Sequence, residues 1–472
     1  MIRYWLLFCL AAFYCTDASA GQANCPDSAA LGQAALSALT GQGFDQVNDH
    51  GELGGAPIQE PPSIDLAVIA FAPGCAPIGI NLLYSRDFPE GRLADIDPDG
   101  WQVTGINWKS DRRDPDQNNA SQFWLPGADW DLLAPESLLP DGSGDRFVLP
   151  YPTSMLKLMP AVRVMSLVDA GEISLDDALV YAGINRTLAQ WLDEMITVSS
   201  NTATFALTWL LHQLGDIQAE EPPDQQALPC AQRTERTELV NGVNALLAGL
   251  GLETLQFNNT RPCDGSFFNN AGSGVGFHHM SAWDTARLLW LIDPRAPAPS
   301  WLVDGEPVDV DFLSQPAREH LLAVLAEQGL HEVLSTTATC GLPGRLPGIP
   351  ARLPERWIDT DGAVVVNGLE LSDNVTPCNT FADVEFAHKT GLSYNYGSNA
   401  GIVHGLDGIA ERHYIIAFNA NLGYRYVSGC FSDGVCYPQR IPAMARAIDR
   451  QLARWLEPAL FADDFSFAGR VE

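Results

Sequence analysis

Lysine is nearly absent from this chain. Of its 27 basic residues, a count along the sequence finds only three lysines, Lys109, Lys157 and Lys389, and the rest are arginines. Arginine serves equally well as a solvated surface charge, but lysine can lose its proton when it is partly buried, and arginine in practice cannot. The scarcity therefore draws attention to the individual lysines as candidates for chemistry.

Positive charge is scarce as a whole. The 472 residues carry a formal net charge of −31. Nucleic acids and anionic membrane surfaces both require a basic footprint, so the composition argues against them as partners. We interpret the acidity as that of a salt-adapted or simply acidic periplasmic protein, with an acidic surface for a cationic partner as the alternative. We expect the protein to be a monomer.

Long apolar runs are missing after the first 20 residues. That opening segment has a basic Arg3, an apolar run over 4–13 and a small-residue ending over 18–20, which is the pattern of a secretory signal peptide. No later run approaches the roughly 20 apolar residues that a membrane span needs. We therefore expect residues 1–20 to be removed and the mature chain, 21–472, to be exported to the periplasm or secreted, without a membrane span.

Common metal-binding patterns are also missing. The chain contains neither a CxxC nor an HExxH motif, and we predict no metal and no cofactor. Two of the ten cysteines lie in the signal segment, and the remaining eight form an even set, which favours disulfides in an exported chain. Short loop closures favour the pairs Cys25–Cys75, Cys230–Cys263, Cys340–Cys378 and Cys430–Cys436.

Hydrophobic periodicity predicts an α+β protein with a split architecture. Helical patterns cover 28–43, dominate 154–328 and return over 441–456, whereas strand patterns occupy 64–72, 78–84, 382–393, 399–406 and 412–421. This order predicts an antiparallel sheet completed by both chain ends, with a helical lobe between them. We place the α/β lobe at 28–150 and 381–460, the helical lobe at 151–330, and surface insertions at 87–144, 215–236 and 341–380.

The stretch SMLK (154–157) places a serine and a lysine at i and i+3. On a helix these side chains share one face, so the Lys157 amine can accept the proton of the Ser154 hydroxyl. A helix start at Ser154 also aims its backbone N–H toward a developing oxyanion, and Pro160 should bend the segment. The alternative is an ordinary helix start with a solvated lysine.

Two further polar groups follow along the chain. Ser199 and Asn201 stand at the opening of a helical run, where their alternative role is helix capping. Lys389, Thr390 and Gly391 lie inside a strand pattern, where the lysine and the hydroxyl can bind an anionic carboxylate and the glycine allows close approach. The alternative there is an ordinary edge strand with a protective charge.

In this order, Ser154-x-x-Lys157, Ser199-x-Asn201 and Lys389-Thr390-Gly391 resemble the motifs of serine β-lactamases and penicillin-binding D,D-peptidases, class A-like β-lactamases most closely. Residues 279–292 also resemble the helix after the Ω-loop of that family, and 415–423 with 445–456 resemble its last strand and C-terminal helix. The resemblance implies a five-stranded antiparallel sheet flanked by N- and C-terminal helices, with an all-helical lobe inserted.

The resemblance also implies an acyl-enzyme mechanism. Ser154 would attack a β-lactam or stem-peptide carbonyl and Lys157 would take its proton, while Ser199 relays a proton to the leaving nitrogen. Asn201 would hold the substrate amide, and Lys389 and Thr390, beside Gly391, would bind the substrate carboxylate. The oxyanion hole would be formed by the backbone N–H groups of Ser154 and Leu392.

Two features depart from the class A pattern. No E-x-x-L-N glutamate precedes Ser281, and Asp264, the only carboxylate in 258–272, is interpreted as a loop cap beside a disulfide. Asn399 stands where the family often has an arginine. The sequence leaves three activities open: β-lactam hydrolysis, peptidoglycan D,D-carboxypeptidase or endopeptidase activity, and β-lactam or muropeptide binding without turnover.

Overall fold

The computed structural model describes residues 25–457 except 115, 117–120, 141, 234–235, 268–273 and 430–437. The predicted signal peptide and the predicted Cys430–Cys436 pair lie outside this part of the chain. The other three predicted disulfides, Cys25–Cys75, Cys230–Cys263 and Cys340–Cys378, are present. Among the described residues, no helix is both long and apolar enough to cross a membrane.

The core of the fold is a six-stranded antiparallel sheet in the order β20-β21-β22-β3-β4-β5. Its strands come from both ends of the chain: β3 (Ile64–Ala70), β4 (Ile78–Ser85), β5 (Phe88–Leu93), β20 (Val384–Leu392), β21 (Gly397–Gly405) and β22 (His413–Ala420). The predicted antiparallel sheet completed by both chain ends is confirmed. The predicted count of five strands was wrong, because β5, within the expected surface insertion 87–144, pairs with β4.

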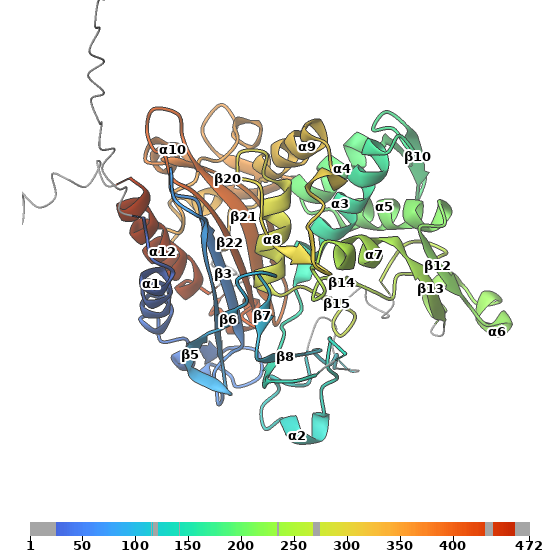
Figure 1. Ribbon diagram of the computed structural model, residues 1–472, viewed down its shortest axis with the longest axis horizontal. Coiled ribbons are helices and arrows are strands. Elements are labelled where there is room, and N and C mark those ends of the chain that lie inside the picture. The colour runs from blue at the N-terminus through green and yellow to red at the C-terminus, as the bar shows by residue number, and fades with distance from the viewer. Residues whose placement is uncertain are drawn as a thin grey trace, which may run out of the picture.

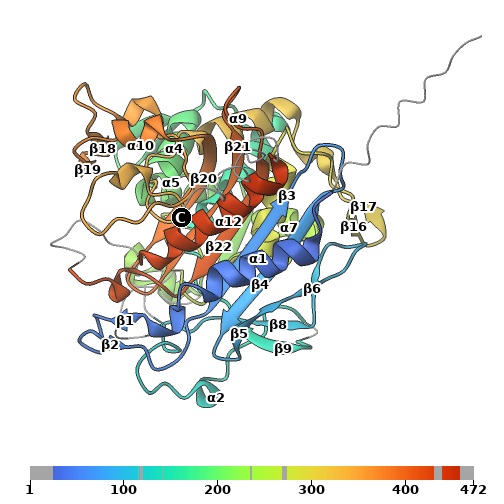
Figure 2. The same ribbon diagram turned by 90° about the vertical axis from the view of Figure 1, so that its left-hand side faces the viewer.

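Two helices cover one face of the sheet and a third covers the other. α1 (Ser28–Thr40) and α12 (Arg440–Leu456) lie side by side across one face, as Figure 2 shows. α8 (Ala282–Ile292) packs on the opposite face, between the sheet and the helical lobe (Figure 1). Alternate residues of the other five strands therefore enter two different cores, which explains why these strands are buried almost throughout, whereas the edge strand β5 is not.

The helical lobe follows the sequence prediction with one correction. Its helices are α3 (Leu158–Asp169), α4 (Leu188–Thr197), α5 (Asn201–Gln213), α7 (Gly242–Gly249) and α9 (Gln315–Ala326). The lobe is not all-helical, because two antiparallel hairpins project from it (Figure 1), β10 (Ala178–Tyr181) with β11 (Ile184–Thr187) and β12 (Ile217–Glu220) with β13 (Thr237–Asn241). These strands are only four or five residues long, too short for the apolar alternation by which strands are recognised.

The remaining elements are short and lie mostly in the predicted insertions. The helices are α2 (Trp130–Leu133), α6 (Pro223–Gln226) and α10 (Thr376–Thr380). The strands are β1 (Asn48–Asp49), β2 (Ala56–Pro57), β6 (Asp95–Ile96), β7 (Val103–Thr104), β8 (Ile106–Lys109), β9 (Asp145–Val148), β14 (Gln256–Phe257), β15 (His278–His279), β16 (Leu302–Val303), β17 (Glu306–Pro307), β18 (Val364–Val366) and β19 (Leu369–Ser372).

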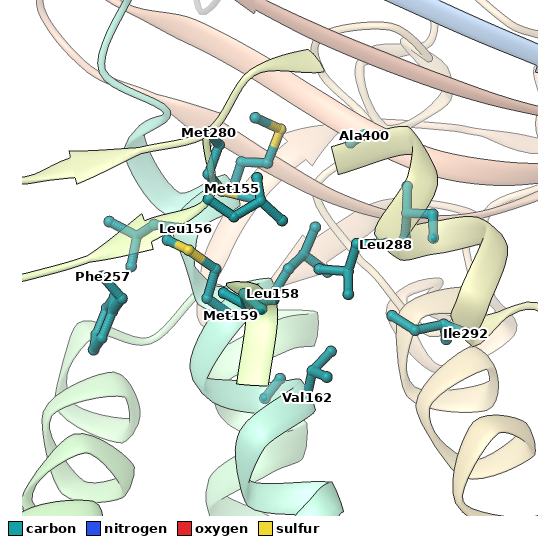
Figure 3. Close-up of a cluster of buried hydrophobic side chains, with 14 of the residues drawn as sticks. Met155, Leu156, Leu158, Met159, Val162, Phe257, Met280, Leu288, Ile292 and Ala400 are labelled. Carbon is teal, nitrogen blue, oxygen red and sulfur yellow. The ribbon is translucent and has the colours of Figure 1, made fainter. Parts of the chain in front are cut away.

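The SMLK segment is a 3-10 turn, η2 (Thr153–Lys157), that continues directly into α3. Pro160 falls in the first turn of α3, where backbone N–H groups have no partner within the helix, so the ring is accommodated there. The apolar side chains of this segment anchor it in the core. Figure 3 shows Leu158 and Met159 between Phe257 on one side and residues of α8 on the other.

Candidate active site

The serine and the lysine of SMLK meet as the sequence predicts. In a 3-10 turn the side chains at i and i+3 eclipse each other, and Lys157 Nζ lies 3.1 Å from Ser154 Oγ. The Lys157 side chain is buried, whereas Ser154 remains partly exposed. The pair therefore offers a hydroxyl that a substrate can reach and an amine that solvent cannot.

Lys157 is surrounded by oxygen atoms from the second motif. Its Nζ donates to the backbone oxygen of Ser199 at 2.6 Å, to Ser199 Oγ at 3.0 Å and to Asn201 Oδ1 at 2.9 Å. These contacts fix the amine between the turn that carries Ser154 and the start of α5. The arrangement holds Lys157 Nζ where it can exchange a proton with the hydroxyl of Ser154 or of Ser199.

Ser199 is free for this role because its neighbour caps the helix. The predicted helical segment breaks between α4 and α5, and the Ser200 side chain accepts the hydrogen bond from Ala203 N at the N-terminus of α5. Ser199 itself has a left-handed φ of +59°, and Thr153, the residue before Ser154, has one of +48°. Such conformations are costly for residues other than glycine and concentrate at functional sites.

The third motif lies on the edge strand β20. Lys389 Nζ donates to Ser199 Oγ at 2.9 Å and to the Thr390 backbone oxygen at 2.8 Å. Thr390 Oγ1 is buried, with no hydrogen-bond partner in the part of the chain that the structure describes. The Ser199 hydroxyl thus stands between two lysine amines, and an unsatisfied hydroxyl lies in the residue next to Lys389.

The backbone of β20 passes close to Ser154. A Cβ atom on Gly391 would lie 2.6 Å from Ser154 N, so only glycine fits at this position. Ser393 N donates to Tyr396 O, and N–H groups alternate in direction along an antiparallel strand, so the Leu392 N–H points away from β21. The backbone donors predicted for an oxyanion hole, Ser154 N and Leu392 N, thus come from segments that pack together.

Burial changes the acid–base behaviour of both lysines. Burial, with the charge of Lys389 as a second cause, holds the pKa of Lys157 well below its ordinary value. Burial lowers the pKa of Lys389 to about 7, although the charge of Glu332 opposes this. A neutral amine at Lys157 can act as a base at neutral pH, whereas an arginine there would stay charged.

Glu332 is a residue that the sequence analysis missed. It follows α9, is partly exposed, and interacts electrostatically with Lys389. Burial raises the pKa of its carboxyl to about 7, and the charge of Lys389 opposes that rise. No motif surrounds Glu332 in the sequence, and only the fold brings it to β20.

The two departures from the class A pattern have structural explanations. Asp264 Oδ1 accepts hydrogen bonds from Ser266 N and Ser266 Oγ, which is the loop-cap role predicted for it. Gly265 packs against the α5 backbone at Phe205 and Trp209, about one and two turns after Asn201 at the start of the helix. Asp264 therefore does not belong to the group of contacts around Lys157.

Asn399 lies opposite Thr390 on β21 but faces a histidine. Its Oδ1 is 3.2 Å from His388 Nδ1, and His388 in turn packs edge-on against His331. The His388 side chain lies on the opposite face of β20 from Lys389, as strand alternation predicts. Asn399 thus adds no positive charge to the surroundings of Lys389.

Comparisons with known proteins give structural matches only. No protein-family model matches the chain, and no curated protein matches it. Solved structures similar to it include PBP-A, at 17% identity over 66% of this chain and 81% of that one, with a TM-score of 0.35. β-Lactamases from Sphaerobacter thermophilus and Desulfarculus baarsii each match at 13% identity over 90% of this chain and 98% of theirs, with TM-scores of 0.40 and 0.41.

The TM-scores of these three structures all lie below 0.5.

Proposed function

We propose that this chain is an exported serine hydrolase of the β-lactamase and D,D-peptidase superfamily, similar to class A β-lactamases, which forms an acyl-enzyme at Ser154 and hydrolyses β-lactam amides. One observation carries the proposal: the buried Lys157 amine lies within hydrogen-bond distance of Ser154 Oγ, Ser199 Oγ and Asn201 Oδ1. A nucleophile beside a base that is itself held by other groups is the arrangement that nucleophilic catalysis requires. Three disulfides support export, because they persist in oxidising compartments.

The first step is acylation. Ser154 Oγ forms a bond to the lactam carbonyl carbon while its proton passes to Lys157 Nζ. The Ser154 and Leu392 N–H groups stabilise the negative oxygen that develops; losing one such donor typically costs about 10²–10³ in rate. When the C–N bond breaks, a proton from Lys157 reaches the leaving nitrogen through the Ser199 hydroxyl, which contacts both lysines.

Substrate orientation follows from the same geometry. Lys389, while charged, and the unsatisfied Thr390 hydroxyl bind the substrate carboxylate beside the nucleophile. The partly exposed position of Ser154 leaves the hydroxyl accessible, and Asn201 holds the substrate amide. The expected ligands are therefore small molecules or short peptides that carry an anionic group near the reacting carbonyl.

A second candidate function is favoured by Asp264. Its carboxylate caps its own loop, so Asp264 does not take the role of the class A carboxylate that activates the water for deacylation. Slow release of the acyl group is typical of peptidoglycan D,D-carboxypeptidases or endopeptidases, and of receptors that bind β-lactams or muropeptides without turnover. The acylation chemistry at Ser154 is common to all three activities.

One experiment separates these functions. The mature protein is incubated with a chromogenic cephalosporin while colour and intact mass are followed together. Rapid colour with multiple turnovers supports a β-lactamase, and one equivalent of colour with a lasting mass increase on Ser154 supports the peptidase or receptor. Ser154→Ala should show neither signal. If the unaltered protein and Ser154→Ala behave identically, the proposal is wrong for β-lactams.

A further inference from the structure

Three potential metal ligands meet at the far end of the sheet from the lysines. Asp293 caps the C-terminus of α8, and His404 and His413 lie opposite each other near the ends of β21 and β22. One ligand atom from each residue lies within 4.8 Å of the other two. The three residues come from three separate elements, so the fold rather than a local motif assembles the cluster.

Hydrogen bonding inside the cluster is incomplete. His413 Nε2 lies 2.6 Å from Asp293 Oδ2, whereas His404 Nε2 lies 3.3 Å from the same oxygen in a direction that makes no hydrogen bond. Both ring nitrogens of His404 are buried without a hydrogen-bond partner among the described residues. Buried polar atoms are normally satisfied, so an imidazole with two unpaired nitrogens beside a carboxylate points to an absent ligand.

The carboxylate is held in the orientation that a cation requires. Asp293 Oδ1 accepts a hydrogen bond from Arg295 N at 3.0 Å, which leaves Oδ2 directed at the histidines. Asp293 thus presents one carboxylate oxygen to both imidazole rings.

The cluster is buried except at one of its two histidines. The Asp293 side chain is fully buried, whereas His413 retains 16% of its side-chain surface. The Phe71 ring packs against His413, and Glu385 lies opposite His404, where it pairs with Arg295. A dry interior with one partly open histidine resembles the setting in which three protein ligands bind a metal and a water completes the coordination.

We propose that Asp293, His404 and His413 bind one divalent transition-metal ion, with Zn²⁺ as the natural occupant. Two imidazole nitrogens and one carboxylate oxygen suit Zn²⁺ better than Ca²⁺ or Mg²⁺, which prefer oxygen ligands. The ion replaces the proton between His413 and Asp293 and gives His404 the partner that it lacks. This site departs from the sequence prediction of no metal, because its ligands are far apart in the chain.

The metal site is separate from the catalytic residues. His404 pairs with Glu385, which lies four residues before Lys389 on the same face of β20, or about 13 Å at the usual rise of a strand. The ion would join the end of α8 to β21 and β22, and its role would be to hold that helix against the sheet. The proposal does not depend on the activity at Ser154.

The test is Zn²⁺ binding by the untagged mature chain with its disulfides intact. After treatment with a chelator and dialysis, the protein is titrated with Zn²⁺ against a competing chromophoric chelator, and its thermal unfolding is measured at each concentration. We expect one ion per chain and a melting temperature that rises with Zn²⁺ concentration. When Co²⁺ is bound in place of Zn²⁺, the protein should show the visible absorption of Co²⁺ with a low coordination number.

Two conservative variants locate the ion. Asp293→Asn keeps the size of the side chain, and His413→Gln changes a partly exposed position. Each variant should weaken Zn²⁺ binding by more than about 100-fold. A loss of that size exceeds the usual effect of residues that contact the ligands but not the metal. His50→Gln, at an exposed histidine, is the control and should bind normally.

The outcome is decided by binding, with folding checked separately. Circular dichroism and the melting temperature without metal show whether each variant is folded. Loss of binding in folded Asp293→Asn and His413→Gln, with His50→Gln unaffected, supports the site. Absence of one-to-one binding by the unaltered chain, or equal binding by all three variants, overturns it.

Discussion

Titratable groups are buried at both ends of one face of the sheet, and their surroundings favour a neutral form at one end and a charged form at the other. At one end Lys157 and Lys389 lie close together, and burial lowers the pKa of both. At the other end Asp293 lies beside two histidines, and the hydrogen bond of His413 with the charges of both rings lowers its pKa against the effect of burial. The first arrangement favours a neutral amine at Lys157, whereas the second favours a fixed ionised carboxylate. The proposed catalytic site and the proposed metal site thus lie at separate positions on the same face of the sheet.

The largest expected effect comes from replacing Lys157 by a residue that is always charged. Lys157→Arg removes the proton acceptor, because a guanidinium stays protonated, and the rate of acylation at Ser154 should fall by about 10²–10⁴-fold. The measurement is the growth of the acyl-enzyme mass with time. Lys109→Arg, at the third lysine, is the matched control, and Asp293→Asn should also acylate normally. Full activity of Lys157→Arg would exclude Lys157 as the base.

A smaller effect is expected on KM when Lys389 loses its charge. Its pKa is lowered to about 7, so the amine is charged below that pH and neutral above it. KM for a substrate with a carboxylate should therefore rise as the pH increases through 7, by up to about tenfold per pH unit. Lys389→Arg remains charged, and its KM should stay flat over the same range. A KM of the unaltered enzyme that does not change with pH would contradict this role.

The smallest expected effect concerns Glu332. Its negative charge raises the pKa of Lys389, so Glu332→Gln should lower that pKa and move the increase in KM toward lower pH by about one unit. Full pH profiles of KM for the variant and the unaltered enzyme measure the shift. Glu327→Gln, at a neighbouring carboxylate that pairs with Arg356, is the control. A shift toward higher pH in Glu332→Gln would show that the two groups do not interact as described.

Local patterns predicted the parts of the site that depend on local spacing. Ser154 and Lys157 are three residues apart, and the 3-10 turn keeps them on one face just as a helix would. Lys389 and His388 point to opposite faces because strands alternate. The main strands and three disulfides were also predicted correctly, since long apolar alternation and short loop closures are strong signals.

The features that were missed depend on contacts between distant segments. β5 contains Pro89 and Gly91 and few apolar residues, so it has no strand pattern, and its position at the sheet edge is what tolerates them. Glu332 reaches Lys389, and Asp293 reaches two histidines, only after the sheet has formed. Ser200 caps α5, and the Ser199 backbone before it is in a left-handed conformation. No sequence pattern predicted that conformation.

The pairing of β3 with β22 has a consequence for how the protein is made. One strand belongs to the first part of the chain and the other to the last, and they are neighbours in the middle of the sheet. The sheet therefore cannot close until nearly the whole chain has been synthesised, and contacts this distant in sequence form slowly. A nascent chain that cannot finish its central sheet stays unfolded for longer, which is the state in which a protein can be threaded across a membrane.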